Sequence, residues 1–439
     1  MNRIAIRREN KNHWEKRVPL VPDDVVKLVA EGIPIAVQPS MVRAFPGEAY
    51  STAGATVREN IEKADLILGV KEVPPSYFQR PAAWMFFSHT IKGQPQNMPA
   101  LRALMDSGST LFDYELIANE EGQRLVFFGR HAGYAGAIET LVALSKRWQS
   151  QGHHHPFTRL RQPYEYTDLA EALTDLNEIG KKIENQGLPE GLPALRIVLM
   201  GAGNVSDGVR KVLDALPTRW HQPEDYLALS DDISSKVVHA TILRERDMVA
   251  PRDEAHEFDL QDFYDHPEKY RPQVARFLAK TTAVITSYYW DDRYPRYITN
   301  ADLKELSTAD DFCLQVIGDI TCDIDGSVEP TIHPTDPGDP IYTFDPRTGT
   351  HKDGLQPGGI SIMAVDNLPC ELSVDASHSF SSALAPFIPS LANADFSAST
   401  MAESGLPTIL QRACIVWRGE LTEAWQELKT PLDTYGNTE

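Results

Sequence analysis

A strand, a glycine turn and a helix follow one another near the middle of the chain. The apolar run Arg-Ile-Val-Leu-Met at residues 196–200 leads into Gly-Ala-Gly-Asn-Val-Ser at residues 201–206. Apolar residues then recur at helical spacing, at Val205, Val209, Val212, Leu213 and Leu216. Because glycines permit a tight turn and a helix N-terminus attracts a pyrophosphate, this layout predicts a Rossmann unit that binds NAD or NADP.

The cofactor contacts predicted from this turn are Gly201, Gly203, Asn204, Val205 and Ser206. Ser206 stands where the usual fingerprint has its third glycine, and the next glycine is Gly208. The acid that binds the ribose is expected about twenty residues further on, near Glu224, although the surrounding His-Gln-Pro-Glu-Asp is no obvious strand end. An ordinary strand–turn–helix without a nucleotide is therefore the alternative, and the sequence does not separate NAD from NADP.

Size, charge and cysteines narrow the class of protein. A chain of 439 residues with 42% hydrophobic content is long enough for about two to three domains. The net charge of −20 argues against a nucleic-acid partner, because such binding relies on clustered lysine and arginine. No run of about eighteen apolar residues occurs, so no membrane helix is expected. The four cysteines lie far apart without CxxC spacing, which favours reduced thiols in the cytoplasm over disulfides or a zinc site.

The first part of the chain alternates between strand and helix patterns. We expect strands at residues 3–6, 35–37, 64–70, 84–88 and 110–112, and helices at residues 22–31 and 96–107. This alternation predicts an α/β fold with two Rossmann-like open parallel-sheet domains and a cleft between them for chemistry. The N-terminal substrate domain is predicted at residues 1–135, completed by C-terminal helices within residues 366–439. The dinucleotide domain is predicted at residues 136–365.

The dinucleotide domain is expected to contain a connector helix and further strands, at residues 133–149, 237–241, 283–286 and 313–320. An acidic stretch rich in tyrosine and proline, residues 253–270, is predicted as a surface insertion. Residues 329–359 have the composition of a long ordered loop, and helices are predicted at residues 373–387 and 407–428. The triplet His-His-His at residues 153–155 fits a solvated loop better than a metal site, because adjacent side chains do not converge on one ion.

Titratable residues follow three predicted strands of the N-terminal domain. Lys71 and Glu72 follow the strand at residues 64–70, while His89 and Glu115 follow the next two strands. Functional side chains of open α/β sheets lie at the carboxyl ends of strands, and a lysine desolvated there is a candidate base. Taken singly, Lys71 is more simply a surface lysine and His89 a structural histidine. Their occurrence at successive strand ends makes a shared site an equal alternative.

Eight short pieces resemble one enzyme family in sequence and in order. They are Arg-Arg-Glu with Trp-Glu-Lys-Arg-Val-Pro-Leu-Val-Pro (7–22), Gly-Val-Lys-Glu-Val-Pro (69–74), Phe-Ser-His-Thr (87–90), Phe-Asp-Tyr-Glu-Leu (112–116), Phe-Phe-Gly-Arg-His-Ala-Gly-Tyr-Ala-Gly-Ala (127–137), Gly-Ala-Gly-Asn-Val-Ser (201–206), Asp-Ile-Thr-Cys-Asp (319–323) and Ala-Val-Asp-Asn-Leu-Pro (364–369). The chain thereby resembles the superfamily of lysine-forming saccharopine dehydrogenases and alanine dehydrogenases. Within it, the resemblance is to the lysine–2-oxoglutarate reductase part of the bifunctional lysine-degradation enzyme. The glycine turn departs from that of the fungal lysine-forming enzymes, and the second half of the bifunctional enzymes is lacking, so a monofunctional enzyme is implied.

The resemblance implies roles for individual residues. Lys71 and His89 match the catalytic lysine and histidine of the family. Substrate binding is implied for Arg17, Glu72, Glu115, Arg124 and Asp366, and Asp319 is implied among the cofactor contacts. A structural salt bridge is the alternative for the two glutamates, and helix capping is the alternative for Asp366.

The activity that the resemblance implies is the NAD(P)-dependent reductive condensation of L-lysine with 2-oxoglutarate to saccharopine, or its reverse. The expected partners are therefore an amino acid and an oxo acid, whose carboxylates suit arginine forks, and whose proton transfers suit a histidine and a desolvated lysine. An opine- or alanine-type dehydrogenase is the second interpretation. A dinucleotide-binding sensor that has lost catalysis is the third. The physiological direction and formation of a homo-oligomer stay open.

Overall fold

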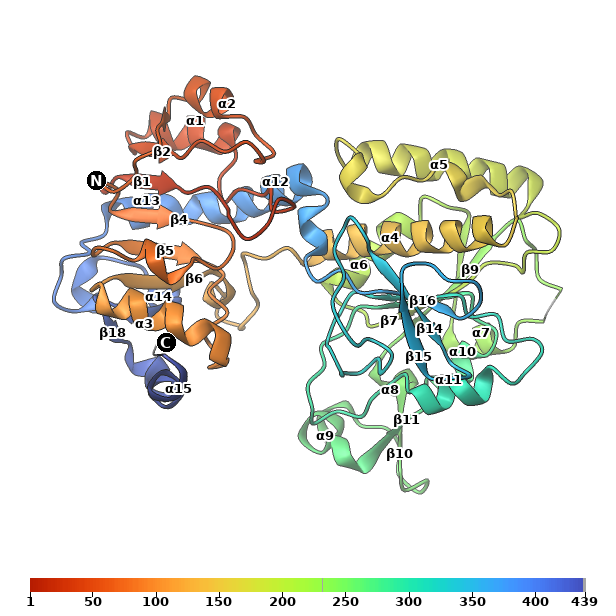
Figure 1. Cartoon of the computed structure of the whole chain (residues 1–439). Helices are drawn as coiled ribbons and strands as arrows, with labels where there is room; N and C mark the ends of the chain where they lie inside the picture. Colours follow the sequence, from red (N-terminus) through yellow and green to blue (C-terminus); the bar gives the residue numbers. More distant parts are fainter. Residues whose placement is uncertain (231, 437–439) are drawn as a thin grey trace. The chain divides into compact units, whose positions relative to one another are not determined.

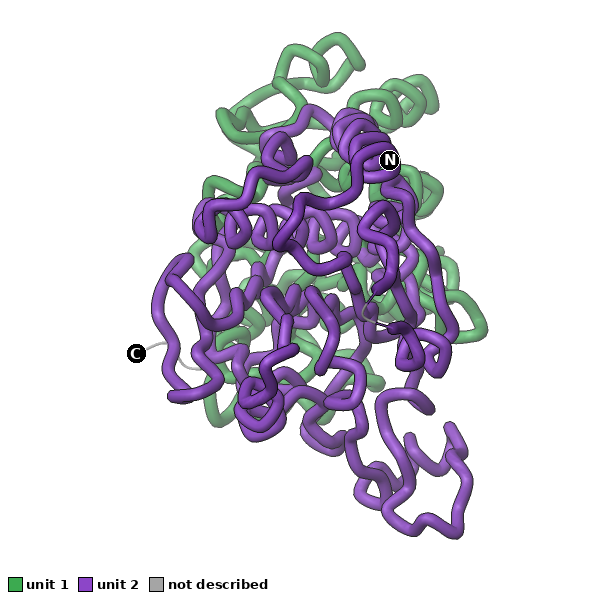
Figure 2. The backbone as a smooth tube through the Cα atoms, turned by 90° about the vertical axis from the view of Figure 1, so that its right-hand side faces the viewer, with its two compact units in different colours: residues 1–128, 373–439 green, residues 129–372 purple. Residues whose placement is uncertain are grey.

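The computed structural model describes residues 1–230 and 232–436, and the chain divides into two compact units (Figure 2). Unit 1 contains Met1–Phe128 and Ser373–Glu439, and unit 2 contains Gly129–Leu372. The boundaries predicted from the sequence, after residues 135 and 365, both fall within unit 2. The C-terminal segment thus belongs to the same unit as the N-terminal segment.

Unit 1 is built on a sheet of eight strands (Figure 1). In spatial order they are β18 (Glu420–Leu421), β17 (Cys414–Trp417), β6 (Thr110–Asp113), β5 (Ala83–Phe86), β4 (Leu66–Leu68), β1 (Ile4–Ile6), β2 (Ile35–Val37) and β3 (Thr56–Val57). β1 to β6 are parallel, and β17 and β18 add an antiparallel edge. The strand order reverses between β1 and β4, because the chain proceeds to β2 on one side and to β4 on the other. Ligands of open α/β sheets bind at such a reversal, at the carboxyl ends of the strands.

The helices of unit 1 come from both segments of the chain. They are α1 (Pro22–Ala30), α2 (Gly47–Thr52), α3 (Met98–Asp106), α12 (Ser373–Leu384), α13 (Ile388–Asn393), α14 (Thr408–Arg412) and α15 (Lys429–Tyr435). α1 begins with Pro22, whose missing N–H is harmless in a first turn, and Asp24 accepts a 2.6 Å hydrogen bond from Ser381 of α12. Phe380 of α12 belongs to the same apolar core as Phe112 of β6. The C-terminal segment is therefore part of the core of unit 1.

Unit 2 contains the second sheet of eight strands (Figure 1). In spatial order they are β15 (Thr350–Asp353), β14 (Ile341–Asp345), β16 (Ile360–Met363), β13 (Val316–Asp319), β12 (Ala283–Thr286), β7 (Arg196–Met200), β9 (Val238–Leu243) and β8 (Thr218–His221). A separate ribbon pairs β10 (Val249–Pro251) with β11 (Tyr270–Pro272). The helices are α4 (Gly129–Ser150), α5 (Leu169–Gln186), α6 (Asn204–Leu213), α7 (Pro223–Leu227), α8 (Glu245–Met248), α9 (Leu260–Asp265), α10 (Ala275–Leu278) and α11 (Asn300–Leu306).

Alternate residues of β7 enter two different apolar cores. Ile197 and Leu199 pack with residues of α4, α5 and α6, whereas Val198 and Met200 pack with residues of α10 and α11. This two-sided burial explains why the strand is continuously apolar in sequence. The α/β fold class and the parallel character of both sheets predicted from the sequence are confirmed, and the strands predicted at residues 35–37 and 283–286 have those bounds.

Two predicted segments are wrong. The helix predicted at residues 407–428 contains α14 and then the hairpin of β17 and β18, whose loop residues Arg418 and Gly419 have φ of 51° and 87°. Positive φ at both loop residues suits a two-residue hairpin turn, and Cys-Ile-Val-Trp before it is a strand-forming run. The loop predicted at residues 329–359 contains the antiparallel pair β14 and β15. Its strand-forming run at residues 341–344 was hidden by the surrounding proline, glycine and aspartate.

The predicted insertion, residues 253–270, contains α9 and places Phe263 in the apolar core of unit 2. All four cysteines are free thiols. None of the described helices is long and apolar enough to cross a membrane. Among the described residues, no group of three or more His, Cys, Asp or Glu side chains is placed to hold a metal ion.

Candidate functional site

Lys71, Glu72 and His89 lie at the carboxyl ends of two neighbouring strands of unit 1. Lys71 follows the end of β4, and His89 follows the end of β5. The two strands are paired in parallel, so their carboxyl ends meet at one edge of the sheet. Nε2 of His89 is 3.4 Å from Oε1 of Glu72. The structure therefore brings the imidazole and this carboxylate together next to Lys71.

The Lys71 ammonium is destabilised by its surroundings. Burial lowers its pKa, and the nearby guanidinium of Arg17 lowers it further, while the carboxylate of Glu72 opposes both effects. A lowered pKa increases the fraction of neutral amine near neutral pH. Lys71 therefore has the electrostatic character of a proton acceptor.

The backbone around Lys71 is held by Glu9, which sequence analysis assigned no role. The amide of Val70 donates to Oε1 of Glu9 at 2.8 Å, and the amide of Lys71 donates to Oε2 at 3.0 Å. Glu9 follows β1, so one carboxylate joins the two strands at the reversal of strand order. Burial raises the pKa of the Glu9 carboxyl, and the neighbouring Arg7 opposes that shift. Its only advance indication was its place in the Arg-Arg-Glu piece.

His89 is held in a left-handed backbone conformation, with φ of 52°. Its carbonyl oxygen accepts a 2.8 Å hydrogen bond from Nδ2 of Asn97, and its ring stacks on Phe87 with centroids 6.3 Å apart. Such a φ is strained for a non-glycine residue, and strain of this kind gathers at functional sites. Burial lowers the pKa of His89, Glu72 opposes this, and Lys71 adds to it. The imidazole is therefore mainly neutral near neutral pH.

Arg17 is buried and already paired. Its Nε donates to Oε1 of Glu15 at 2.8 Å, its Nη2 donates to Oε2 at 2.5 Å, and its guanidinium lies 4.3 Å from the ring centroid of Phe128. The guanidinium of Arg17, which the sequence predicts to bind a substrate carboxylate, therefore already donates to Glu15 through Nε and Nη2. Through space, Arg17 acts on the pKa of Lys71.

Glu115 and Arg124 form an ion pair in which Nη1 of Arg124 is 3.2 Å from Oε1 of Glu115. The glutamate side chain is 17% exposed and the arginine side chain 54% exposed, so the pair opens to solvent on the arginine side. Asp113, at the end of β6, accepts from the amides of Ser88 and Glu115, both at 2.8 Å, and burial raises its pKa to about 6. Asp113, another residue missed from the sequence, ties the loop after β5 to the loop after β6.

The two glycines in the turn of unit 2 have different surroundings. Gly201 has φ of 103°, and a Cβ there would lie 2.8 Å from the carbonyl oxygen of Ser287, so only glycine fits. Gly203 is exposed, and a Cβ there would meet nothing within 4 Å. This open approach to the backbone at the start of α6 is what a pyrophosphate requires, so the residues present fit a dinucleotide.

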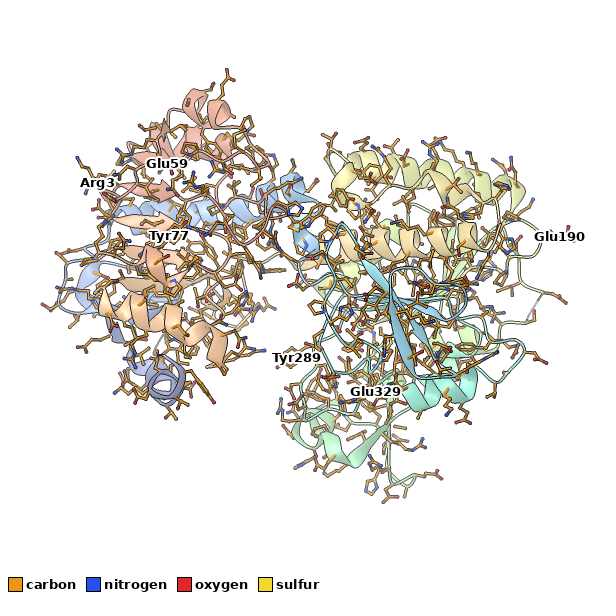
Figure 3. The ribbon with its side chains drawn as sticks, in the orientation of Figure 1. Arg3, Glu59, Tyr77, Glu190, Tyr289 and Glu329 are labelled. Carbon is orange, nitrogen blue, oxygen red and sulfur yellow. The ribbon has the colours of Figure 1, made fainter. Side chains whose placement is uncertain are left out.

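The remaining turn residues divide between support and exposure. Oγ of Ser206 is 2.7 Å from Oγ of Ser287, so the residue in the third-glycine place fastens α6 to the segment after β12. Asn204 is exposed and Val205 is half-buried. Two residues beyond Ser287, Tyr289 is 69% exposed at the surface of unit 2 (Figure 3). Tyr289 belongs to none of the sequence motifs described above, so the sequence did not single it out.

Glu224 does not follow the strand that lies next to the glycine turn. This residue follows β8, but β8 pairs with β9 and not with β7, and Glu224 is exposed and 3.3 Å from Nη2 of Arg276. The strand beside β7 is β9, which ends at Leu243 and is followed by Arg244. The count of about twenty residues located the next strand in sequence, whereas the ribose position depends on the neighbouring strand in space.

Asp319 and Asp366 differ sharply in exposure. Asp319 is fully buried at the end of β13 and accepts hydrogen bonds of 2.5 to 2.6 Å from the hydroxyls of Thr286, Thr321 and Thr331. Its carboxylate therefore organises the loop after β13. Asp366 is exposed on the segment after β16. Its contact with a substrate stays a prediction.

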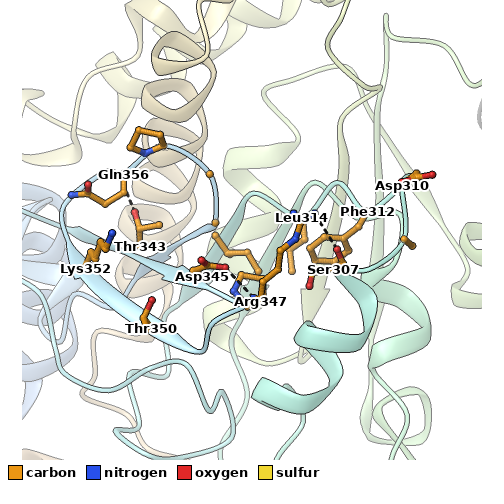
Figure 4. Close-up of a pocket in the computed structure, with 16 residues that line it drawn as sticks. Ser307, Asp310, Phe312, Leu314, Thr343, Asp345, Arg347, Thr350, Lys352 and Gln356 are labelled. Atoms are coloured by element: carbon orange, nitrogen blue, oxygen red, sulfur yellow. Dashed lines mark hydrogen bonds between the residues drawn. The ribbon is translucent and has the colours of Figure 1, made fainter.

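A cavity of about 520 Å³ in unit 2 contains none of the predicted site residues (Figure 4). Its lining includes Phe312, Arg347, Lys352 and Gly359. These residues lie before β13, between β14 and β15, within β15 and before β16. They are at the amino ends of the parallel strands, opposite to the edge that carries the glycine turn.

Comparison with known proteins identifies two domains of one family. The N-terminal domain of alanine dehydrogenase/PNT matches residues 5–135, and its C-terminal domain matches residues 252–424. Alpha-aminoadipic semialdehyde synthase of Arabidopsis thaliana is 36% identical over 96% of this chain, which spans 41% of that protein. Saccharopine dehydrogenase [NAD(+), L-lysine-forming] of Neurospora crassa is 25% identical over 87% of this chain and 89% of its own. A solved L-alanine dehydrogenase has the same fold, with a TM-score of 0.61, 18% identity and coverage of 98% of this chain and 99% of its own.

Proposed function

Because this chain belongs to the alanine dehydrogenase/PNT family, we propose that it is an NAD(P)-dependent oxidoreductase that condenses L-lysine with 2-oxoglutarate and reduces the product to saccharopine, or catalyses the reverse. The main support for acid–base chemistry is that His89 lies against Glu72, beside Lys71, whose pKa is lowered. The similarity to alpha-aminoadipic semialdehyde synthase over 96% of the chain supports these substrates.

The chemistry needs protons moved near neutral pH. The ammonium group of lysine loses a proton, and the neutral amine attacks the ketone carbon of 2-oxoglutarate. The nitrogen then gives up one further proton, the former ketone oxygen takes up two protons in all and leaves as water, and a protonated imine remains. When bound, the nicotinamide supplies the hydride that converts the imine carbon to that of a secondary amine. We assign the proton transfers to Lys71 and His89, since both are half-buried groups whose lowered pKa keeps a neutral acceptor available.

The carboxylates of the substrates need cationic partners. We assign one of them to Arg124, because its side chain is 54% exposed and keeps donors beyond its pair with Glu115. Arg17 takes a positioning role, holding Glu15 and lowering the pKa of Lys71. Glu72 and Asp366 are proposed to receive the ammonium groups of the lysine substrate.

Unit 2 is proposed to hold the dinucleotide through its glycine turn and the first turn of α6. The four free thiols suit a reducing compartment such as the cytoplasm, which we propose as the location.

Oxidation of the reduced cofactor tests the proposal. Purified protein with NADH or NADPH should consume the cofactor only when lysine and 2-oxoglutarate are both present. Consumption with pyruvate and ammonia instead would replace these substrates by those of an alanine-type enzyme. Binding of the dinucleotide without turnover on any amino acid and oxo acid pair would support a sensor.

A further inference from the structure

The cavity of about 520 Å³ in unit 2 has a cationic end and an apolar end (Figure 4). Lys352 lies on one side of it, Phe312 and Leu314 lie on the other, and Arg347 lies between them. Leu314 is buried and Phe312 is half-buried. Pockets that take small molecules have volumes of this order and combine apolar walls with a few polar groups. The cavity therefore has the size and lining of a small-molecule site.

The two cations of the lining keep donors free for a ligand. Lys352 is exposed, and its ammonium group has no hydrogen bond or ion pair within the part of the chain that the structure describes. Nη2 of Arg347 donates only a 3.4 Å hydrogen bond to the carbonyl oxygen of Ser307. The nearby acid of the lining, Asp345, accepts a 2.9 Å hydrogen bond through Oδ1 from the backbone amide of Arg347. Its carboxylate is thus engaged by the backbone of its own turn.

A third positive charge is buried behind the wall of the cavity. Arg147 of α4 is 1% exposed; its Nε and Nη2 donate to Oγ of Ser361 at 3.0 and 2.8 Å. Its Nη1 donates at 2.8 Å to the carbonyl oxygen of Gly358, which belongs to the cavity lining. These acceptors are neutral, no carboxylate of the described residues pairs with the guanidinium, and burial lowers the pKa of Arg147 to about 10. Because buried charges are normally paired, positive charge behind Gly358 is left uncompensated by the protein.

The opposite end of the cavity is unsuited to an anion. Helix α11 ends directly before Ser307, and the carbonyl groups at a helix C-terminus disfavour negative charge. The exposed acid Asp310 lies at this end as well. A negative charge is therefore favoured at the Lys352 end, whereas Phe312 and Leu314 favour hydrocarbon.

We propose that this cavity binds a small organic carboxylate, whose charged group contacts Lys352 and Arg347 and whose hydrocarbon part packs on Phe312 and Leu314. A carboxylate accepts hydrogen bonds from an ammonium group and from a guanidinium fork, and the hydrocarbon part gains by leaving water. The site lies at the amino ends of the parallel strands of unit 2. It goes beyond the proposed function, because its lining includes none of the residues assigned to the substrates or to the dinucleotide.

Two probes that differ in charge test the proposal. 3-Phenylpropanoate and 3-phenylpropanamide have nearly the same shape, and saturation-transfer NMR titration of the full chain measures both dissociation constants. Two partly exposed charge contacts correspond to about tenfold tighter binding of the carboxylate. The double variant Lys352→Gln with Arg347→Gln should bring the two constants together. Lys182→Gln with Arg219→Gln removes an exposed lysine from α5 and an exposed arginine from β8, at the other end of the sheet, and should keep the preference.

A variant that fills the cavity locates the probe. Ala309 is an exposed residue of the lining, so Ala309→Trp should occupy the cavity without disturbing the core and should abolish binding of both probes. Loss of the preference in the Lys352 and Arg347 variant, together with loss of binding in Ala309→Trp at an unchanged melting temperature, supports the site. No binding of the carboxylate to the wild type, equal affinities for the two probes, or a preference that survives in either variant overturns it.

Discussion

Two glycines in unit 2 are predicted to serve packing, and a third to serve ligand approach. A Cβ on Gly208 of α6 would lie 2.2 Å from the carbonyl oxygen of Arg130 in α4, and a Cβ on Gly133 of α4 would lie 2.0 Å from the carbonyl oxygen of Val205. Ordinary contacts of a Cβ begin at 3.4 Å. The obstructing atoms belong to the backbone, so no side-chain rotation relieves the clash, and the two helices must separate by about 1 Å.

Two opposing energies decide whether Gly208→Ala raises or lowers the stability of unit 2. Alanine is favoured over glycine within a helix by about 1 kcal/mol. Overpacking a well-packed contact costs about 1–3 kcal/mol, and a clash between two backbones belongs at the upper end of that range. We therefore expect a net loss of about 2 kcal/mol in the free energy of unfolding of unit 2.

Differential scanning calorimetry or urea unfolding followed by circular dichroism measures this loss. Gly203→Ala is the matched control, because the same methyl group there would meet nothing within 4 Å. That control should unfold as the wild type does but bind the dinucleotide more weakly, since the methyl group enters the approach to the pyrophosphate. A Gly208→Ala protein as stable as the wild type would refute the close helix contact.

Further predictions concern the site in unit 1. Lys71→Met should lower kcat by about 10²- to 10⁴-fold in steady-state assays, with the melting temperature and the affinity for the dinucleotide unchanged, as expected for a lost acid–base group. Glu72→Gln should lower the pKa of His89 further, because the carboxylate of Glu72 raises that pKa. NMR titration of the imidazole measures the pKa directly, and the acidic limb of the kcat/KM profile should move to lower pH. An upward shift of the His89 pKa would contradict the geometry. Arg17→Gln should destabilise unit 1 by about 3–5 kcal/mol, because it removes the guanidinium that pairs with the buried carboxylate of Glu15. Adding Glu15→Gln should recover part of that loss in thermal melts, and a double variant no more stable than the single one would argue against the pair.

Local patterns in the sequence predicted most of the strands and much of the site edge. Continuous apolar runs mark strands that are buried on both faces, as in β7 and β12, so their positions could be predicted without knowledge of their neighbours. Lys71 and His89 could be placed at one edge for the same reason, since both follow such runs. The strand at Cys414–Trp417 was missed because a short apolar run fits a helix or a strand equally well.

Spatial order of strands is what the sequence did not contain. The motif count led to Glu224, because spacing along the chain locates the next segment and not the next strand in the sheet. In the structure β9 is inserted between β7 and β8, so the strand next to the glycine turn is β9 and not the strand that precedes Glu224. Pairings such as that of Arg17 with Glu15 were equally inaccessible, because they depend on which side chains are buried together.

The two sheets reverse their strand order in the same way but have different chemistry at the reversal. In unit 1 the strand β1 is followed by Arg7 and Glu9, and the first helix begins only at Pro22. Arg7 packs closely against Gly69: a Cβ added to this glycine would lie 3.1 Å from Cδ of Arg7. In unit 2 the strand β7 is followed at once by an open glycine turn and by α6. Backbone amides at a helix start suit a pyrophosphate, whereas a reversal filled by buried charged side chains suits acid–base groups. This difference is why we propose nucleotide binding in unit 2 and proton transfer in unit 1, although the two sheets share one topology.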